Sequence, residues 1–362
     1  MDALIYFTEF IRLQVNNKNN VAVALLDLSK AFDSIDHSLL LKKLTALGFN
    51  QPAIEIISSY LSNRLQRVAS NGVFSDWLEV KRGVPQGTIL GPLLFSLYVN
   101  DMKTNANCEI LQYADDTIVM KSAPNINHAI KNVENCISDL ISYFEYHSLK
   151  LNSDKTEFIV FGKNKGNNKL VVNNIPIEES DTVKYLGVLI DNELKFDKHV
   201  KFVLRKMAQG IKSLYVLRNA VSTYLKTIIL NAYVLSHIQY PAVLLSTIDQ
   251  HLVTTLEKQL NWAVKACFNR RKHESSRDLK IKNNILPIKY LLEYRNATYC
   301  RLVINNTKPA FNEKRGVKLT TNQFYSQKRT GELIYCAKSS SKILDRSMIK
   351  KNSQFHAEKF LV

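Results

Sequence analysis

The sequence predicts an α+β fold, with strands and helices alternating in its first half and a mainly helical part after them. Residues 21–26 form a nearly continuous apolar run, which is typical of a central strand buried on both faces. Residues 125–146 repeat apolar side chains at helical spacing, so this helix is expected to pack under the sheet. Further strands are predicted at 157–161, 170–177 (with an Asn-Asn turn) and 183–190, and further helices at 3–15, 38–47, 199–217, 223–235 and 251–267.

Two adjacent carboxylates, Asp115 and Asp116, stand between two short apolar runs, residues 108–112 and 117–120. Each run is typical of a strand, so the acidic pair falls where the chain must turn back. A hairpin turn in solvent usually carries Asn-Gly or Asp-Gly, whereas this turn places two like charges at close range. Such a pair is tolerated most readily where a cation binds, although an exposed acidic turn is the alternative.

A third carboxylate, Asp27, directly follows the apolar run 21–26, where the predicted strand is expected to end. A carboxylate at the end of a buried strand is well placed to hold a ligand. The alternative is that Asp27 caps the next turn. Asp33 and Asp36 are the better capping candidates, because they lie nearer to the start of the helix predicted at 38–47.

Glycine and proline punctuate the segment between these carboxylates. Gly83, Pro85, Gln86 and Gly87 come first, and then Gly91 with Pro92 opens an apolar helix through about residue 100. Backbone amides at such a turn can approach a ligand closely. Ordinary loop-to-helix punctuation is the alternative.

These segments together resemble the reverse transcriptase of non-LTR (LINE-type) retrotransposons. Residues 26–37 (LDLSKAFDSIDH) resemble the first palm motif of that family, 83–92 (GVPQGTILGP) the second, and 113–117 (YADDT) the third. Residues 149–158 resemble the fourth palm motif, and 185–191 resemble the hairpin that grips the primer end. The resemblance spans about residues 2–200 and implies a right-hand polymerase palm, which is a mixed sheet with helices on one face, followed by a mainly helical thumb and C-terminal region.

The resemblance implies three regions: a palm over 1–195, a helical thumb-like region over 196–307, and a basic, weakly structured C-terminal segment over 308–362. Only 26 residues precede Asp27, where family members carry a fingers subdomain. We therefore expect the palm and thumb portion of a 5′-truncated element, with the fingers largely missing.

The implied activity is that of an RNA-directed DNA polymerase, which adds dNTPs to a DNA primer on an RNA template. Two Mg²⁺ ions, or Mn²⁺ in their place, stabilise the attacking 3′ oxygen and the leaving pyrophosphate, and Mg²⁺ prefers hard oxygen ligands. By resemblance, Asp27 and Asp115 bridge both ions and Asp116 supports them. The backbone carbonyl of Leu28 is a further implied ligand.

Four other residues receive roles from the resemblance. Phe32 is placed beneath the sugar of the incoming nucleotide, where a bulky ring would exclude a 2′-hydroxyl; a core aromatic is the alternative. Gln86 and Gly87 would contact the nucleotide and the template strand. Lys155 is a candidate general acid toward pyrophosphate, with an ordinary surface lysine as the alternative.

The charge distribution favours nucleic acid as a partner. The net charge is +17, and residues 262–330 hold 16 Lys and Arg against 4 Asp and Glu, interleaved with aromatic residues. A basic, aromatic-bearing surface suits a phosphate backbone, although a basic tail without a partner is the alternative. Candidate nucleic-acid contacts are Leu186 and Gly187 of the primer-grip hairpin and the basic cluster Arg270, Arg271 and Lys272.

The composition also excludes several classes. No signal peptide and no apolar run of about 18 residues is present, so no membrane association is expected. The five cysteines form no C-x-x-C pair, which favours reduced thiols in an intracellular protein (nuclear or cytoplasmic, with no targeting signal identified) and argues against zinc. Two alternative functions stay open: a catalytically inert, truncated nucleic-acid-binding remnant, and a relative of RNA-dependent RNA polymerases. Phe32 and Ala114 argue against the latter.

Overall fold

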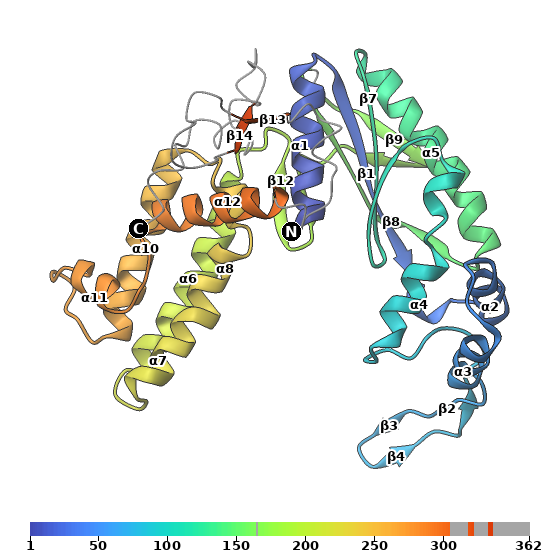
Figure 1. Cartoon of the computed structure of the whole chain (residues 1–362), viewed down its shortest axis with the longest axis horizontal. Helices are drawn as coiled ribbons and strands as arrows, with labels where there is room; N and C mark the ends of the chain where they lie inside the picture. Colours follow the sequence, from blue (N-terminus) through green and yellow to red (C-terminus); the bar gives the residue numbers. More distant parts are fainter. Residues whose placement is uncertain (164–165, 305–317, 322–331, 336–362) are drawn as a thin grey trace. The chain divides into compact units, whose positions relative to one another are not determined.

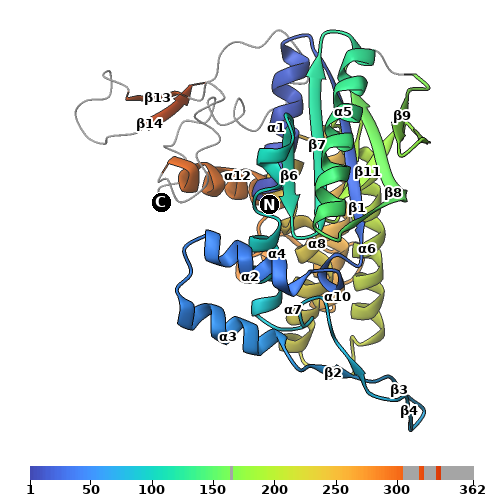
Figure 2. The same cartoon turned by 90° about the vertical axis from the view of Figure 1, so that its right-hand side faces the viewer.

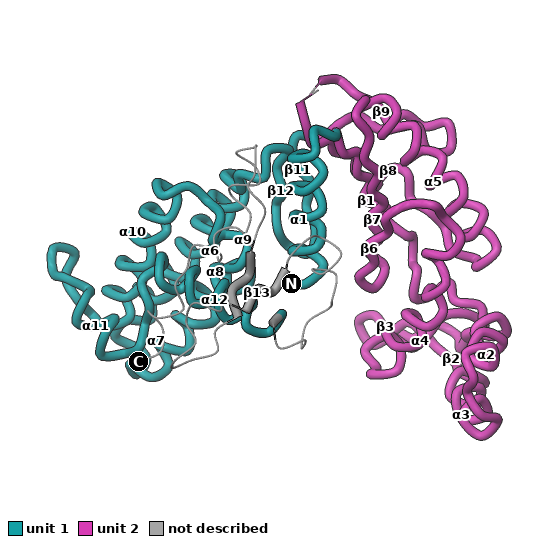
Figure 3. Tube along the Cα trace, turned by 45° about the horizontal axis from the view of Figure 1, so that its top comes forward, with its two compact units in different colours: residues 1–19, 181–362 teal, residues 20–180 magenta. Residues whose placement is uncertain are grey.

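The computed structural model describes residues 1–163, 166–304, 318–321 and 332–335, which form two compact units. One unit holds residues 20–180, and the other holds 1–19 together with the part after 180 (Figure 3). The helix α1 (Asp2–Asn16) therefore groups with the C-terminal half of the chain. The predicted C-terminal segment 308–362 lies outside the described residues, apart from two short strands.

The unit of residues 20–180 is built on a four-stranded sheet with the order β6-β7-β1-β8 (Figure 2). Its strands are β1 (Asn20–Ser29), β6 (Glu109–Tyr113), β7 (Asp116–Ala123) and β8 (Lys150–Phe161). Every neighbouring pair is antiparallel, so the predicted mixed sheet is wrong. The reason is the strand order: β7 lies between β1 and β6, and β1 lies between β7 and β8, so strands that run in the same direction are never neighbours.

Strand β1 is central and buried, as its apolar run predicts. Ala22, Ala24, Leu26 and Leu28 alternate along it and enter one hydrophobic core. The strand does not end at Asp27 but continues to Ser29, because β8 pairs with it over that stretch and pairs Asp27 with Asn152.

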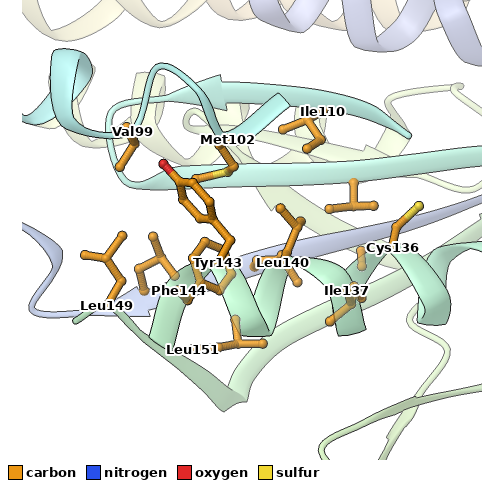
Figure 4. Packing of buried hydrophobic residues seen from close by; sticks show 14 of the residues in the cluster. Val99, Met102, Ile110, Cys136, Ile137, Leu140, Tyr143, Phe144, Leu149 and Leu151 are labelled. Carbon is orange, nitrogen blue, oxygen red and sulfur yellow. The ribbon is translucent and has the colours of Figure 1, made fainter. Parts of the chain in front are cut away.

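Helix α5 (Ile126–Tyr146) covers one face of this sheet (Figures 1 and 2). Its start is capped by the Asn125 side chain, which accepts a hydrogen bond from the Asn127 amide at 2.8 Å. Val133, Ile137 and Leu140 are at most 1% exposed. Figure 4 shows two of these side chains among their neighbours from the sheet and the loops. Each such side chain contributes roughly 1.5–3 kcal/mol through burial, so this helix anchors the strands that carry the site.

The segment between β1 and β6 carries the second motif. The predicted helix at 38–47 is present as α2, and its cap is Asp36, whose Oδ1 accepts from the Leu39 amide at 2.9 Å. The elements in chain order are η1 (Ala31–Asp33), α2 (His37–Ala46), α3 (Gln51–Leu61), β2 (Leu65–Gln66), β3 (Ala69–Ser70), β4 (Val73–Phe74), β5 (Leu78–Glu79), α4 (Leu90–Tyr98) and η2 (Met102–Asn105). Helix α3 and the four short strands were not predicted.

The Asn-Asn turn predicted within residues 170–177 is present, whereas the strand predicted at 183–190 is divided into the two strands of a hairpin. β9 (Lys169–Val172) and β10 (Ile175–Glu178) are joined by Asn173 and Asn174, both with positive φ, as a two-residue hairpin turn requires. In the other unit, β11 (Thr182–Tyr185) pairs with β12 (Val188–Asp191).

The rest of the second unit is mainly helical, as predicted. Its elements are α6 (Asp197–Val216), α7 (Thr223–Leu230), the π-helical turn η3 (Asn231–Leu235), α8 (Ser236–Gln239), α9 (Ala242–Leu245), α10 (Gln250–Cys267), α11 (Arg277–Lys282), α12 (Ile288–Ile304), β13 (Lys318–Thr321) and β14 (Glu332–Tyr335). Among the helices that the structure describes, none is both long and apolar enough to cross a bilayer.

Candidate functional site

The acidic pair lies at the tip of the β6–β7 hairpin. Tyr113 pairs with Asp116, so Ala114 and Asp115 form a two-residue turn between the strands. Ala114 has φ +54°, a left-handed conformation that costs an L-residue about 1–2 kcal/mol. This tight turn places the Asp115 carboxylate at the hairpin tip and makes Asp116 the first residue of β7.

The sheet brings Asp27 to the same end. The β1–β7 ladder pairs Leu26 with Thr117, so the next position along it sets Asp27 beside Asp116. Partial desolvation, followed by the charges of Asp115 and Asp27, raises the pKa of Asp116 above its ordinary value. The predicted carboxylates thus share one electrostatic environment, although they are far apart in the sequence.

These residues suit a hard divalent cation in the chemistry of their donors. All are carboxylates, and the mutual repulsion that raises the Asp116 pKa is what a dication would relieve. Within the described ranges, no three His, Cys, Asp or Glu side chains already stand in a metal-binding arrangement. Binding an ion would therefore require these exposed and half-buried carboxylates to turn toward a common point.

Lys155 lies next to Asp27 because of a bulge in β8. The β1–β8 register shifts between Leu25 and Asp27, where residues 153–156 of β8 lie opposite Leu26 alone. The Lys155 Nζ is 4.0 Å from the Asp27 Oδ2, and their side chains are 70% and 41% exposed. An exposed pair at this distance is worth at most about 1 kcal/mol, so Lys155 stays solvated and free to move.

A pocket of about 370 Å³ joins the first and second motifs to the acidic turn. Of the predicted site residues, Phe32, Gln86, Gly87 and Asp115 line it together. Lining residues that the sequence did not single out as site residues are Lys30, Ala31, Pro85, Gly91 and Pro92. All five belong to motif segments identified from the sequence: Lys30 and Ala31 to the first, and Pro85, Gly91 and Pro92 to the second, whose glycine and proline content was the available signal.

Backbone contacts clamp the first motif to the second. The Gly83 amide donates to the Ile35 carbonyl at 2.8 Å, and the Val84 amide donates to the Phe32 carbonyl at 2.9 Å. The imidazole Nε2 of His37 lies 2.7 Å from the Gly83 carbonyl and donates to it. A Cβ on Gly83 would lie 2.7 Å from the Asp33 Cα, so the contact requires glycine.

Helix α4 supports the pocket from behind. The Phe32 ring stacks on the buried Phe95 ring with centroids 4.5 Å apart. Thr88 Oγ1 donates to the Pro85 carbonyl at 2.7 Å and accepts from the Tyr60 hydroxyl at 2.9 Å. Tyr60 comes from the unpredicted α3, and no local sequence pattern links it to Thr88.

The predicted nucleic-acid contacts lie in the other unit. Leu186 and Gly187 form the two-residue turn of the β11–β12 hairpin, with φ +44° and +79°. In the basic cluster after α10, Arg270 already contacts Glu274 (3.4 Å) and Asp278 (2.8 Å).

The other two members of the cluster differ from Arg270. The Lys272 Nζ stands over the Trp262 ring, 5.3 Å from its centroid. Arg271 is exposed, and no described carboxylate lies within ion-pair distance of either Arg271 or Lys272 in the part of the chain that the structure covers. Arg271 and Lys272 are therefore better candidates for phosphate contact than Arg270.

The fold and the assembled motifs match a known class. The family model described as "Reverse transcriptase (RNA-dependent DNA polymerase)" matches residues 5–190, and the chain belongs to this family. The match covers the whole four-stranded sheet, the pocket and the β11–β12 hairpin.

The relatives confirm the resemblance to non-LTR elements. The chain is 30% identical over 195 residues to the RNA-directed DNA polymerase from mobile element jockey of Drosophila melanogaster. This match covers 51% of this chain and 21% of that protein. It is 27% identical over 227 residues to the probable RNA-directed DNA polymerase from transposon BS of the same species, covering 60% and 25%. The chain thus spans about a quarter or less of these relatives. Apo telomerase from Candida tropicalis is similar at 13% identity and a TM-score of 0.40, covering 87% of this chain and 56% of that one.

Proposed function

We propose that this chain provides the palm and a helical thumb-like region of an RNA-directed DNA polymerase, which adds dNTPs to a DNA primer on an RNA template. One observation carries the proposal: a single pocket is lined by Phe32 of the first motif, Gln86 and Gly87 of the second, and Asp115 of the third. The three motifs therefore serve one ligand site. The curated relatives are named as RNA-directed DNA polymerases, which supports the same reading.

The carboxylates at the end of the sheet are the proposed ligands of two Mg²⁺ ions. Asp27 and Asp115, with Asp116 and the Leu28 carbonyl, would hold them. When bound, the ions supply positive charge to the triphosphate and to the attacking 3′ oxygen. Without that charge, the three carboxylates would repel a triphosphate.

The chain's own side chains do the remaining work in this proposal. Phe32, braced by Phe95, forms a rigid wall at which a 2′-hydroxyl would clash, and so selects dNTPs over rNTPs. Gln86 and Gly87 position the nucleotide and the template. Lys155, an exposed amine beside Asp27, is the candidate donor of a proton to the leaving pyrophosphate. Leu186 and Gly187, at a rigid two-residue turn, are the candidate primer contacts.

Two measurements test the proposal. The first is Mn²⁺ binding followed by electron paramagnetic resonance, which needs no turnover; Asp115→Ala should abolish it, and Asp139→Ala, an exposed change on α5, should not. The second is primer extension on an RNA template with Mg²⁺ and dNTPs, with the same pair of variants. Salt-dependent nucleic-acid binding without Mn²⁺ binding or extension would favour the inert remnant.

A further inference from the structure

Asp33 is an acidic residue of the first motif that has no part in the proposed mechanism. It closes η1, and its Oδ1 accepts a hydrogen bond from the Gln86 Nε2 at 2.8 Å. We propose that Asp33 is a positioning residue that fixes the orientation of the Gln86 side-chain amide in the nucleotide pocket. This inference rests on the proposed function, because it concerns how that pocket meets its nucleotide.

The chemistry of the two groups determines the orientation. An ionised carboxylate can only accept hydrogen bonds, so the amide must turn its NH₂ toward Asp33. The Oε1 on the other branch of the same planar group then points away from Asp33. Gln86 lines the pocket, so its Oε1 offers a hydrogen-bond acceptor to a nucleotide bound there. The matching group on a nucleotide is a donor: a sugar hydroxyl or the amino group of a base.

The backbone holds the two side chains at this distance. The Asp33 amide donates to the Lys30 carbonyl at 2.9 Å, which closes the turn that aims the Asp33 carboxylate. On the other side, Gly83 packs against the Asp33 backbone so closely that a Cβ would come within 2.7–2.9 Å of three of its atoms. Gln86 follows Gly83 by only three positions, so the clamp between the motifs also fixes the reach of its side chain.

The Asp33 carboxylate binds the Gln86 amide without competition from a described cation. Among the described residues, no Lys, Arg or His nitrogen lies within ion-pair distance of its carboxylate. Nearby His37 instead donates to the Gly83 carbonyl. Asp36, three residues on, is engaged in capping α2. In this part of the structure, Asp33 therefore serves the Gln86 amide and not an ion pair.

An exchange of the two functional groups tests the proposal. In single-nucleotide incorporation, Asp33→Asn and Gln86→Glu should each raise the KM for dNTP by roughly three- to tenfold, with a smaller effect on kcat. The double variant Asp33→Asn/Gln86→Glu places an amide opposite a carboxylate again and keeps an acceptor facing the pocket. Its KM should return to within about twofold of wild type. Asp139→Asn, the same chemical change on the exposed face of α5, should leave the KM unchanged.

A second measurement needs no catalysis. In protein labelled with ¹⁵N-glutamine, the Gln86 side-chain signal is the one lost in Gln86→Glu. That signal should move to a new position in Asp33→Asn and keep its position in Asp139→Asn, because only the first change alters the carboxylate that binds the amide. A signal that does not respond, or single-variant losses that simply add in the double variant, overturns the proposal. If the signal moves in Asp33→Asn but the wild-type chain incorporates no nucleotide, the proposed function is overturned instead.

Discussion

The clamp between the first and second motifs makes a sharp prediction about Gly83. Gly83→Ala adds a Cβ that would lie 2.7 Å from the Asp33 Cα, 2.8 Å from its carbonyl oxygen and 2.9 Å from its carbonyl carbon. All three are backbone atoms and cannot rotate away, so one motif must shift against the other. Gly83 also has φ +86°, which an L-residue adopts only with strain.

The matched control is Gly87→Ala. Gly87 has a similar φ of +76°, but a Cβ there would meet nothing within 4 Å. Both variants incur the backbone strain of about 1–2 kcal/mol, partly offset by the lower entropy of the unfolded chain. Only Gly83→Ala adds the clash, which we set at about 1–3 kcal/mol by analogy with overpacked cores. The difference between the two variants therefore isolates the contact between the motifs.

The assay is urea unfolding followed by far-ultraviolet circular dichroism. Gly83→Ala should lower the free energy of unfolding by roughly 1–3 kcal/mol more than Gly87→Ala does. In a dNTP-binding assay, Gly83→Ala should also weaken affinity, because the clamp sets the pocket wall. Equal destabilisation by the two variants would refute the reasoning and show that the motifs are not clamped through Gly83.

Three further predictions concern charge and specificity. The raised pKa of Asp116 means that folding disfavours its ionised form. The free energy of unfolding therefore falls as pH rises from the ordinary Asp value of 3.8 through the pKa of the folded state. Asp116→Asn should accordingly raise the melting temperature at neutral pH and leave it unchanged near pH 3. Phe32→Val should reduce discrimination between dNTP and rNTP about 10- to 100-fold in competitive incorporation. For duplex binding, Arg271→Gln and Lys272→Gln should each reduce the slope of log affinity against log salt by about 0.9, whereas Arg270→Gln, already paired with two carboxylates, should change it less.

The sequence predicted best those elements whose local pattern matches their burial. Helix α5 buries nine of its residues on one face, and the periodic apolar side chains that do so are readable without a structure. Strand β1 was predicted because its apolar run matches its burial, but the position of its last residue was not. Asp27 looked like a terminus because it is polar, yet pairing with β8 carries the strand two residues further. Tertiary pairing overrides the local signal there.

Contacts between residues far apart in the chain could not be predicted from the sequence. Whether strands pair parallel or antiparallel depends on which strands become neighbours. The pairing is antiparallel throughout this sheet because β7 lies between β1 and β6 and β1 lies between β7 and β8, and no local pattern reveals that order. Helix α3 was missed although its local signals are present: Asn50 caps it, and Ile54, Ile57 and Tyr60 recur at helical spacing and pack against the core. The bond from Gln86 to Asp33 spans 53 positions, and no periodicity connects them. The motifs predicted that their segments serve one site, but not that these two side chains would bond.

The site concentrates local costs that the rest of the unit must offset. Ala114 is held in a left-handed turn, Asp116 carries a charge that its neighbours disfavour, and Gly83 leaves no space for a side chain. None of these features stabilises the unit. The turn places Asp115 at the pocket and the Gly83 contact places the second motif there, whereas Asp116 does not line it. The buried face of α5 against the sheet supplies the compensating burial. A carboxylate pair on a strained turn is therefore a feature that this fold maintains at a cost in stability, which is the physical argument for assigning it a ligand rather than a turn alone.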